Sequence, residues 1–181
     1  RREAIAAAAK LARETHALIE AAGIACPTVT GAGTGPFLLE SDSGVYTELQ
    51  PGSYIFMDAD YGRNTLSPGD PEFVHSLYLW ATVMSVPTAE RAIVDAGLKA
   101  FSVDSGLPLV ADRRELECIK ASDEHGVLQA RTGAHSLHVG DKLRLVPGHC
   151  DPTVNLYDWL VGVREDRVEC VWPGSARGAR L

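Results

Sequence analysis

The sequence predicts an α/β segment followed by a mainly antiparallel β domain, and two observations carry this prediction. In the first part of the chain, a helical pattern, a short apolar run and a glycine-rich loop follow one another, which is the order of a βα-repeat protein. From about residue 72, short apolar runs recur between turn residues, which is typical of a sandwich or barrel. We place the boundary in the turn-rich stretch 67–71, which gives segments 1–70 and 71–181.

The first segment is expected to begin with an amphipathic helix. Residues 1–22 place apolar and small side chains at the three- and four-residue spacing of one helix face, and Gly23 follows as a helix-ending glycine. A short buried strand is expected over 24–30 and a second strand over 45–50. Ser53 either caps a short helix running toward residue 61, or the apolar residues after it continue a strand.

The second segment is expected to consist of short strands joined by turns. Glycine stands next to, or close behind, aspartate or histidine at most of the breaks between the apolar runs. The dipeptide Glu165-Asp166 predicts a tight hairpin between the last two runs. The expected strands are 77–86, 91–94, 100–103, 116–121, 127–130, 142–146, 159–163 and 168–172.

Composition excludes several classes of protein. The 181 residues include 17 basic and 24 acidic side chains, and the net charge of −7 argues against nucleic acid or an anionic membrane surface as partner. No apolar run reaches the roughly 18 residues of a membrane span, and no signal-peptide pattern is present. The four cysteines are scattered, so we expect reduced thiols in a cytoplasmic protein. The chain begins inside a helical pattern without methionine, so we expect it to be part of a longer protein.

Two glycine-containing loops are candidates for binding a phosphate group. The loop 31–35 follows a strand, where backbone amides either cradle a phosphate or form a plain tight turn. Its third glycine position is Pro36 and no Gly-Lys-Ser/Thr follows, so it is neither a dinucleotide fingerprint nor a Walker loop. One strand later, Gly52-Ser53 opens a possible short helix. Two such loops on successive strands are the phosphate site of (β/α)₈ barrels, so the pair is more specific than either loop.

The stretch 146–153 gathers an imidazole, a thiol and a carboxylate at the end of a strand. In an extended backbone, residues i and i+2 point the same way, so His149 and Asp151 share a side while Cys150 points away. An imidazole and a carboxylate suit Mn²⁺, Mg²⁺ or Zn²⁺ with open positions for water or substrate. The alternative is an ordinary turn in which the aspartate precedes a proline.

Two further positions have weaker signals. Tyr61 either reaches a ligand near the glycine loops or packs against its neighbours. Glu124-His125 lies between two strand runs and is either an acid–imidazole pair at the domain edge or a surface turn. His16 is expected to be a packed or half-exposed ring on its helix face, and His75, His135 and His138 are expected to be surface residues. The three tryptophans are expected to be core residues.

Three motifs in the same order resemble the D-threonine aldolase / D-serine dehydratase family. They are Thr30-Gly-Ala-Gly-Thr-Gly-Pro-Phe37, Glu48-Leu-Gln-Pro-Gly-Ser-Tyr-Ile-Phe-Met-Asp-Ala-Asp-Tyr61 and Val146-Pro-Gly-His-Cys-Asp-Pro-Thr-Val-Asn-Leu-Tyr-Asp158. The shorter stretches 96–100, 103–106 and 171–173 also resemble sequences of this family, so the resemblance covers essentially the whole chain. These enzymes use pyridoxal phosphate and have an alanine-racemase-type fold.

The resemblance implies a fold and a set of site residues. Residues 1–70 would be the α/β end of a (β/α)₈ barrel, that is, the last βα units of a truncated TIM-type barrel, and 71–181 a mainly antiparallel β domain carrying the metal site. In the family, the lysine that forms the Schiff base lies early in the barrel. None of the four lysines of this chain stands in a matching sequence context, so no catalytic residue is assigned. The fragment is therefore expected to be inactive alone. Carried over by motif, the cofactor-binding residues are Gly33, Thr34, Gly52, Ser53 and Tyr61, and the metal ligands are His149 and Asp151.

The resemblance also implies a reaction. Dehydratase members tend to place cysteine two residues after the histidine and bind Zn²⁺, whereas aldolase members place aspartate there and prefer Mn²⁺ or Mg²⁺; Asp151 therefore favours an aldolase. The implied reaction is retro-aldol cleavage of a D-3-hydroxy amino acid, D-threonine or 3-hydroxy-D-aspartate, with pyridoxal 5′-phosphate as electron sink and the metal on the β-hydroxyl. The alternatives are a D-serine or D-3-hydroxyaspartate dehydratase and a non-catalytic β-rich binding domain. By analogy the full-length protein would be a homodimer.

Overall fold

The computed structural model describes residues 1–175 and 177, and the chain divides into two compact units, Arg1–Ile55 and Phe56–Leu181. The division lies earlier than the 70/71 boundary that the sequence predicts. Residues 56–76 belong to the second unit because their backbone bonds lie there: Ala59 N donates to Pro147 O at 3.0 Å and Ser76 N donates to Phe56 O at 2.9 Å. Within the described residues, no helix is long and apolar enough to cross a membrane.

The first unit begins with the expected helix, α1 (Arg2–Ala21). It ends in a Schellman motif, in which Gly23 has a φ of +77° and Ile24 N donates to Ile19 O at 3.2 Å. Glycine is required there because side chains disfavour this left-handed conformation. The predicted helix and its glycine stop are confirmed.

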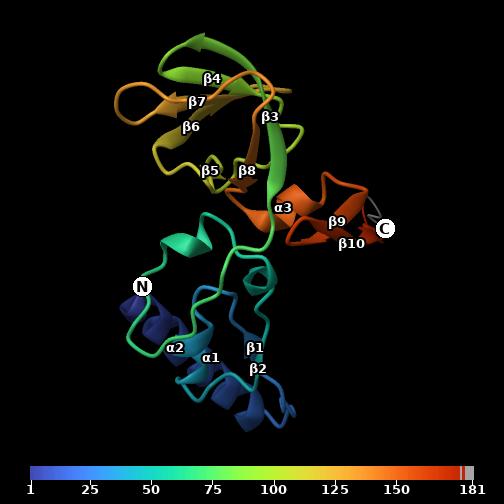
Figure 1. Cartoon of the computed structure of the whole chain (residues 1–181). Helices are drawn as coiled ribbons and strands as arrows, with labels where there is room; N and C mark the ends of the chain where they lie inside the picture. Colours follow the sequence, from blue (N-terminus) through green and yellow to red (C-terminus); the bar gives the residue numbers. More distant parts are fainter. Residues whose placement is uncertain (176, 178–181) are drawn as a thin grey trace. The chain divides into compact units, whose positions relative to one another are not determined.

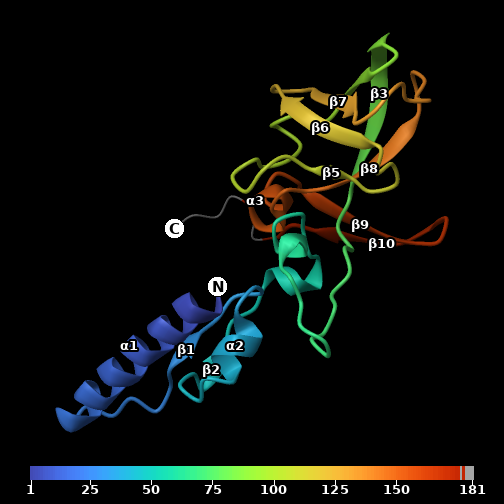
Figure 2. The same ribbon diagram turned by 90° about the vertical axis from the view of Figure 1, so that its left-hand side faces the viewer.

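Two short parallel strands follow, β1 (Thr30–Gly31) and β2 (Glu48–Leu49), with the short helix α2 (Phe37–Ser41) between them (Figure 2). Parallel pairing through a helix is the connection of a βα repeat. The buried strand expected over 24–30 is wrong: Ile24 is 60% exposed, and Pro27 has no N–H for a strand partner. Ser53 opens only a 3₁₀ turn, η1 (Ser53–Ile55). No closed (β/α)₈ barrel is present in the described part of the chain.

The second unit is built on a six-stranded antiparallel sheet with the order β5-β8-β3-β4-β7-β6 (Figure 1). The edge strands β5 and β6 also contact each other, so the sheet is nearly closed into a barrel. The long strand β3 belongs to both halves of the sheet, because its first half pairs with β8 and its second half pairs with β4. The strands are β3 (Leu79–Thr88), β4 (Arg91–Val94), β5 (Leu109–Val110), β6 (Leu116–Ala121), β7 (Gly126–Ala130) and β8 (Lys142–Val146).

Most of the expected strands are confirmed, and two differences have clear causes. The run 100–103 is not a strand, because Ala100 N and Phe101 N both donate to Gly97 O and close a turn. Phe101 is instead fully buried in the barrel core with Val83, Leu128 and Leu145. Strand β5 was not expected from the sequence.

Outside the barrel, the second unit contains the short helix α3 (Cys150–Val154), the 3₁₀ turn η2 (Tyr61–Arg63) and a hairpin of β9 (Trp159–Arg164) and β10 (Arg167–Pro173). The predicted hairpin turn is confirmed, with Glu165 at a φ of +53°. Figure 2 shows this hairpin standing apart from the six-stranded sheet. Helix α3 directly follows β8, so it carries the stretch that the sequence proposes for a metal.

Candidate functional site

The two glycine loops lie side by side in the first unit. Because β1 and β2 are parallel, the loops that follow them leave from the same edge of the pair. Tyr54 N donates to Thr34 Oγ1 at 3.0 Å and ties one loop to the other. Thr34 and Ser53 are both buried, at 7% and 5% exposure. The adjacency that the phosphate hypothesis requires is therefore present.

The space in front of Gly52 is open. A Cβ built on Gly52 meets no other atom within 4 Å, so the backbone at this loop is open to a ligand. Two hydroxyl side chains and the loop backbone surround the same turn region. These donor groups fit a phosphate, which accepts hydrogen bonds from backbone amides and hydroxyls.

The candidate metal ligands lie at the start of α3, and their backbone differs from the expectation. His149 is extended, with φ −141° and ψ 126°, and is the N-cap residue of α3. The chain turns helical at Cys150, so the extended geometry expected through Asp151 is wrong. Proline at position 152 is compatible with this helix because N–H groups of a first turn have no intrahelical partner.

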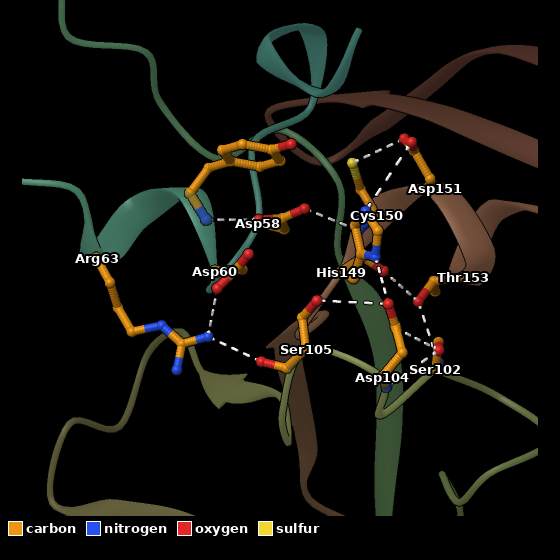
Figure 3. Close-up of polar contacts among 11 residues, drawn as sticks. Asp58, Asp60, Arg63, Ser102, Asp104, Ser105, His149, Cys150, Asp151 and Thr153 are labelled. Carbon is orange, nitrogen blue, oxygen red and sulfur yellow. Dashed lines mark hydrogen bonds and ion pairs between the residues drawn. The ribbon is translucent and has the colours of Figure 1, made fainter. Parts of the chain in front are cut away.

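The helical turn still brings the two side chains together. His149 Nε2 lies 3.9 Å from Asp151 Oδ2. Cys150 is fully buried, and its Sγ lies 3.6 Å from Asp151 Oδ1, so this thiol does not point away from the carboxylate as the sequence suggested. Figure 3 shows the three side chains around the first turn of α3.

The other ring nitrogen of His149 has a partner that sequence reasoning missed. His149 Nδ1 lies 2.7 Å from Asp104 Oδ2, on the loop between β4 and β5 (Figure 3). The two residues are 45 positions apart, so no local pattern could have linked them. Burial lowers the pKa of His149, but the hydrogen bond to Asp104 and the negative charges around the ring outweigh it and raise the pKa above 6.5. Hydrogen bonds from Ser102 and then His149 lower the pKa of Asp104 to about 2.

The buried carboxylate of Asp58 forms hydrogen bonds with the backbone of both η2 and α3. Asp58 is fully buried; its Oδ1 accepts from Tyr61 N at 2.9 Å and its Oδ2 accepts from Cys150 N at 2.9 Å. Its backbone oxygen lies 3.0 Å from His75 Nε2. Asp58 thus fixes η2 and α3 to each other, a role that no local pattern in the sequence indicates.

Two further candidates are Tyr61 and the pair Glu124-His125. Tyr61 is the first residue of η2 in the second unit, whereas the phosphate-loop residues belong to the first. Glu124 binds Lys99 Nζ at 2.5 Å on the surface and makes no acid–imidazole pair with His125 among the described contacts.

His149 and Asp151 fit one divalent ion. A ring nitrogen and a carboxylate oxygen each bind such an ion at about 2.0–2.2 Å, so two ligand atoms on one ion lie at most about 4.4 Å apart. The observed 3.9 Å is within that limit. Among residues 1–175 and 177, no group of three or more histidine, cysteine, aspartate or glutamate side chains is arranged to hold a metal, so the fit concerns this pair.

Comparison with known proteins gives consistent results. Residues 76–163, from the start of the barrel into β9, match the family described as "Putative serine dehydratase domain". The chain is 52% identical over 182 residues to a 3-hydroxy-D-aspartate aldolase from Paracoccus denitrificans (strain Pd 1222), covering 98% of this chain and 46% of that protein. The chain therefore spans about half the length of the relatives it matches.

Solved structures share the fold. A D-threonine aldolase from Filomicrobium marinum is 44% identical with a TM-score of 0.90, over 98% of this chain and 48% of the other. A D-threo-3-hydroxyaspartate dehydratase variant in the metal-free form is 27% identical with a TM-score of 0.74, over 96% and 52%. An Ala racemase-like protein from Idiomarina loihiensis, at 23% identity and a TM-score of 0.68 over 89% and 48%, shares the fold alone. With its three motifs, its β domain and these relatives, the chain belongs to the D-threonine aldolase / D-serine dehydratase family.

Proposed function

We propose that this chain is the C-terminal part of a pyridoxal-phosphate- and divalent-metal-dependent lyase that cleaves D-3-hydroxy amino acids by a retro-aldol reaction. The observation that carries the proposal is the placement of Asp151 Oδ2 beside His149 Nε2, which puts a carboxylate and an imidazole at one ion position. The aldolase names of the relatives at 44–52% identity support a substrate of the D-threonine or 3-hydroxy-D-aspartate type.

The first unit would hold the phosphate group of the cofactor. Gly33, Thr34, Gly52 and Ser53 lie on the two adjacent loops at one edge of the parallel pair. Such loops after successive strands are the phosphate site of a (β/α)₈ barrel, and we interpret the unit as the last βα repeats of that barrel. Tyr61, which Asp58 holds through its backbone amide, would lie beside the cofactor.

The second unit would hold the divalent ion through His149 Nε2 and Asp151. When bound, the cofactor's pyridine ring takes up the electron pair of the broken Cα–Cβ bond, and the ion lowers the pKa of the substrate's β-hydroxyl. With only His149 and Asp151 as protein ligands, coordination positions remain for that hydroxyl. Because Nδ1 of His149 is engaged by Asp104, Nε2 is the ring nitrogen that would bind the ion.

The Schiff-base lysine would come from residues outside this chain. Lys99 is exposed and paired with Glu124, and no lysine lies in a context that matches the family's reactive one. The chain alone would therefore be inactive. The full-length protein, which we propose to be a cytoplasmic homodimer, is the species to test.

The decisive experiment is product analysis with the full-length protein, pyridoxal phosphate and Mn²⁺. From D-threonine, retro-aldol cleavage yields glycine and acetaldehyde, and from 3-hydroxy-D-aspartate it yields glycine and glyoxylate. His149→Ala should abolish turnover while absorbance of bound pyridoxal phosphate remains. Protein that takes up no pyridoxal phosphate would instead support a non-catalytic binding domain.

A D-serine or D-3-hydroxyaspartate dehydratase is the second candidate. The matching domain family and the 27% identical dehydratase structure favour it, and Cys150 Sγ lies beside the carboxylate that would bind the ion. Dehydration followed by hydrolysis releases ammonia and a 2-oxo acid, with no glycine. Ammonia in stoichiometric yield with no aldehyde would move this candidate ahead of the aldolase.

A further inference from the structure

The loop 102–105 is built against the histidine at the start of α3. Thr153, which is 1% exposed, donates through its hydroxyl to His149 O at 2.7 Å and accepts from Ser102 N at 3.2 Å. One buried hydroxyl therefore joins the loop backbone to the histidine backbone. The loop is therefore held against α3 by backbone contacts in addition to the side-chain contact between Asp104 and His149 (Figure 3).

Both oxygens of Asp104 are engaged, and this orients the carboxylate. Oδ1 accepts from Ser102 Oγ at 2.6 Å, and Oδ2 lies 2.7 Å from His149 Nδ1 and 3.4 Å from Ser105 Oγ. Arg63 donates to Ser105 O at 2.8 Å and holds the far side of the loop. An exposed carboxylate with this many partners is fixed in direction even though its side chain is 48% exposed.

The ring of His149 thus lies between two carboxylates with different roles. A carboxylate on Nδ1 keeps the proton on that nitrogen, which leaves the lone pair on Nε2. Nε2 is the nitrogen that lies 3.9 Å from Asp151 Oδ2. We propose that Asp104 is a positioning residue that fixes the tautomer and direction of His149, so that Nε2 is presented to a divalent ion shared with Asp151. This inference rests on the metal site of the proposed function.

The test is metal affinity rather than turnover. Full-length protein stripped with a chelator is titrated with Mn²⁺ alone by calorimetry. Asp104→Ala should weaken Mn²⁺ binding about 10- to 100-fold, the range typical of an outer partner of a ligating histidine. Asp104→Asn should fall between Ala and the native protein, because its amide oxygen still accepts from Nδ1–H without the charge.

Asp141→Asn is the matched control. Asp141 also lies beside a histidine, with Oδ2 3.8 Å from His138 Nδ1, but on an exposed turn away from α3. The Asp141→Asn variant should bind Mn²⁺ with the affinity of the native protein. Thermal unfolding of each variant shows whether a loss of affinity accompanies a loss of fold.

A second measurement separates positioning from a purely structural role. In ¹⁵N-histidine spectra of the metal-free protein at alkaline pH, the neutral ring of native His149 should carry its proton on Nδ1, and Asp104→Ala should shift it to Nε2. If Asp104→Ala binds Mn²⁺ within about twofold of native while His149→Ala does not bind, the role of Asp104 is overturned and the metal site stands. If His149→Ala binds Mn²⁺ like the native protein, the metal site and this inference both fall.

Discussion

Gly148 lies against the backbone of Gly106, so closely that a Cβ added at Gly148 would stand 2.0 Å from the carbonyl oxygen of Gly106. The two glycines belong to the two segments that carry the candidate site: Gly148 precedes His149, and Gly106 closes the turn that holds Asp104. The absence of a side chain at Gly148 therefore allows the loop to approach the histidine.

Gly148→Ala should push the two segments apart. A clash with backbone cannot be relieved by rotating a side chain, so we expect a loss of about 1–3 kcal/mol in the free energy of unfolding, measured with urea, and weaker Mn²⁺ binding. Gly52→Ala is the control for both measurements, because its added Cβ meets no atom within 4 Å. Native stability and native Mn²⁺ affinity in Gly148→Ala would contradict this account.

Gly52→Val should weaken cofactor binding with little effect on the fold. The space in front of Gly52 is open in this chain, so the side chain would occupy the space proposed for the phosphate. We expect the Kd for pyridoxal phosphate, followed by absorbance, to rise about tenfold, which is ~1.4 kcal/mol. An unchanged Kd together with native circular dichroism would show that the phosphate lies elsewhere.

Asp151→Ala and Cys150→Ser should separate the ligand from its neighbour. Loss of the carboxylate should reduce Mn²⁺ affinity by more than about 100-fold, because a direct ligand is lost rather than an outer partner. Cys150→Ser keeps a donor beside Asp151, so affinity should stay within about threefold of native, with a stability loss of about 1 kcal/mol from the buried hydroxyl. If the serine variant loses the metal and the alanine variant keeps it, the ligand pair is misassigned.

The buried thiol of Cys118 should make stability pH-dependent. Burial raises the pKa of Cys118 from 9.0 to about 11. Between these values the unfolded chain has lost the proton that the folded chain keeps, so stability is full below pH 9 and falls as pH rises toward 11. Cys118→Ala should flatten that part of the urea-unfolding profile. At pH 8, iodoacetamide should label Cys118 only after unfolding, and labelling of the folded protein at the rate of a free thiol would contradict its burial.

Local patterns were sufficient for most of the strands. Residues 91–94, 116–121 and 142–146 form strands with the predicted bounds because their apolar residues end at turn residues on both sides. Strand β5 has only Leu109 and Val110, which is too short to show a periodic pattern. It exists because β8 pairs with it across 35 to 37 positions of sequence. A two-residue strand that forms because of its partner has no recognisable pattern in its own sequence.

The candidate site was predictable only in part, for a similar reason. Thr34, Ser53, His149 and Asp151 stand in local motifs. The structure joins Thr34 to Tyr54, the neighbour of Ser53, and brings His149 close to Asp151. Helix α3 was missed because the backbone from His149 to Asp151 was expected to be extended, although a proline at position 152 is well tolerated in a first helical turn. Asp104 lies 45 positions from His149 and Asp58 lies 92 positions from Cys150, so only the three-dimensional structure reveals these two contacts.

The double role of Asp58 has a consequence for how the second unit opens. A single buried carboxylate accepts the amide protons of both Tyr61 and Cys150, so release of that group exposes both amides at once. In hydrogen exchange, these two amides should therefore share one opening free energy, although they are 89 positions apart. Asp58→Asn should speed the exchange of both amides together, since one amide would then face an NH₂ group instead of an oxygen.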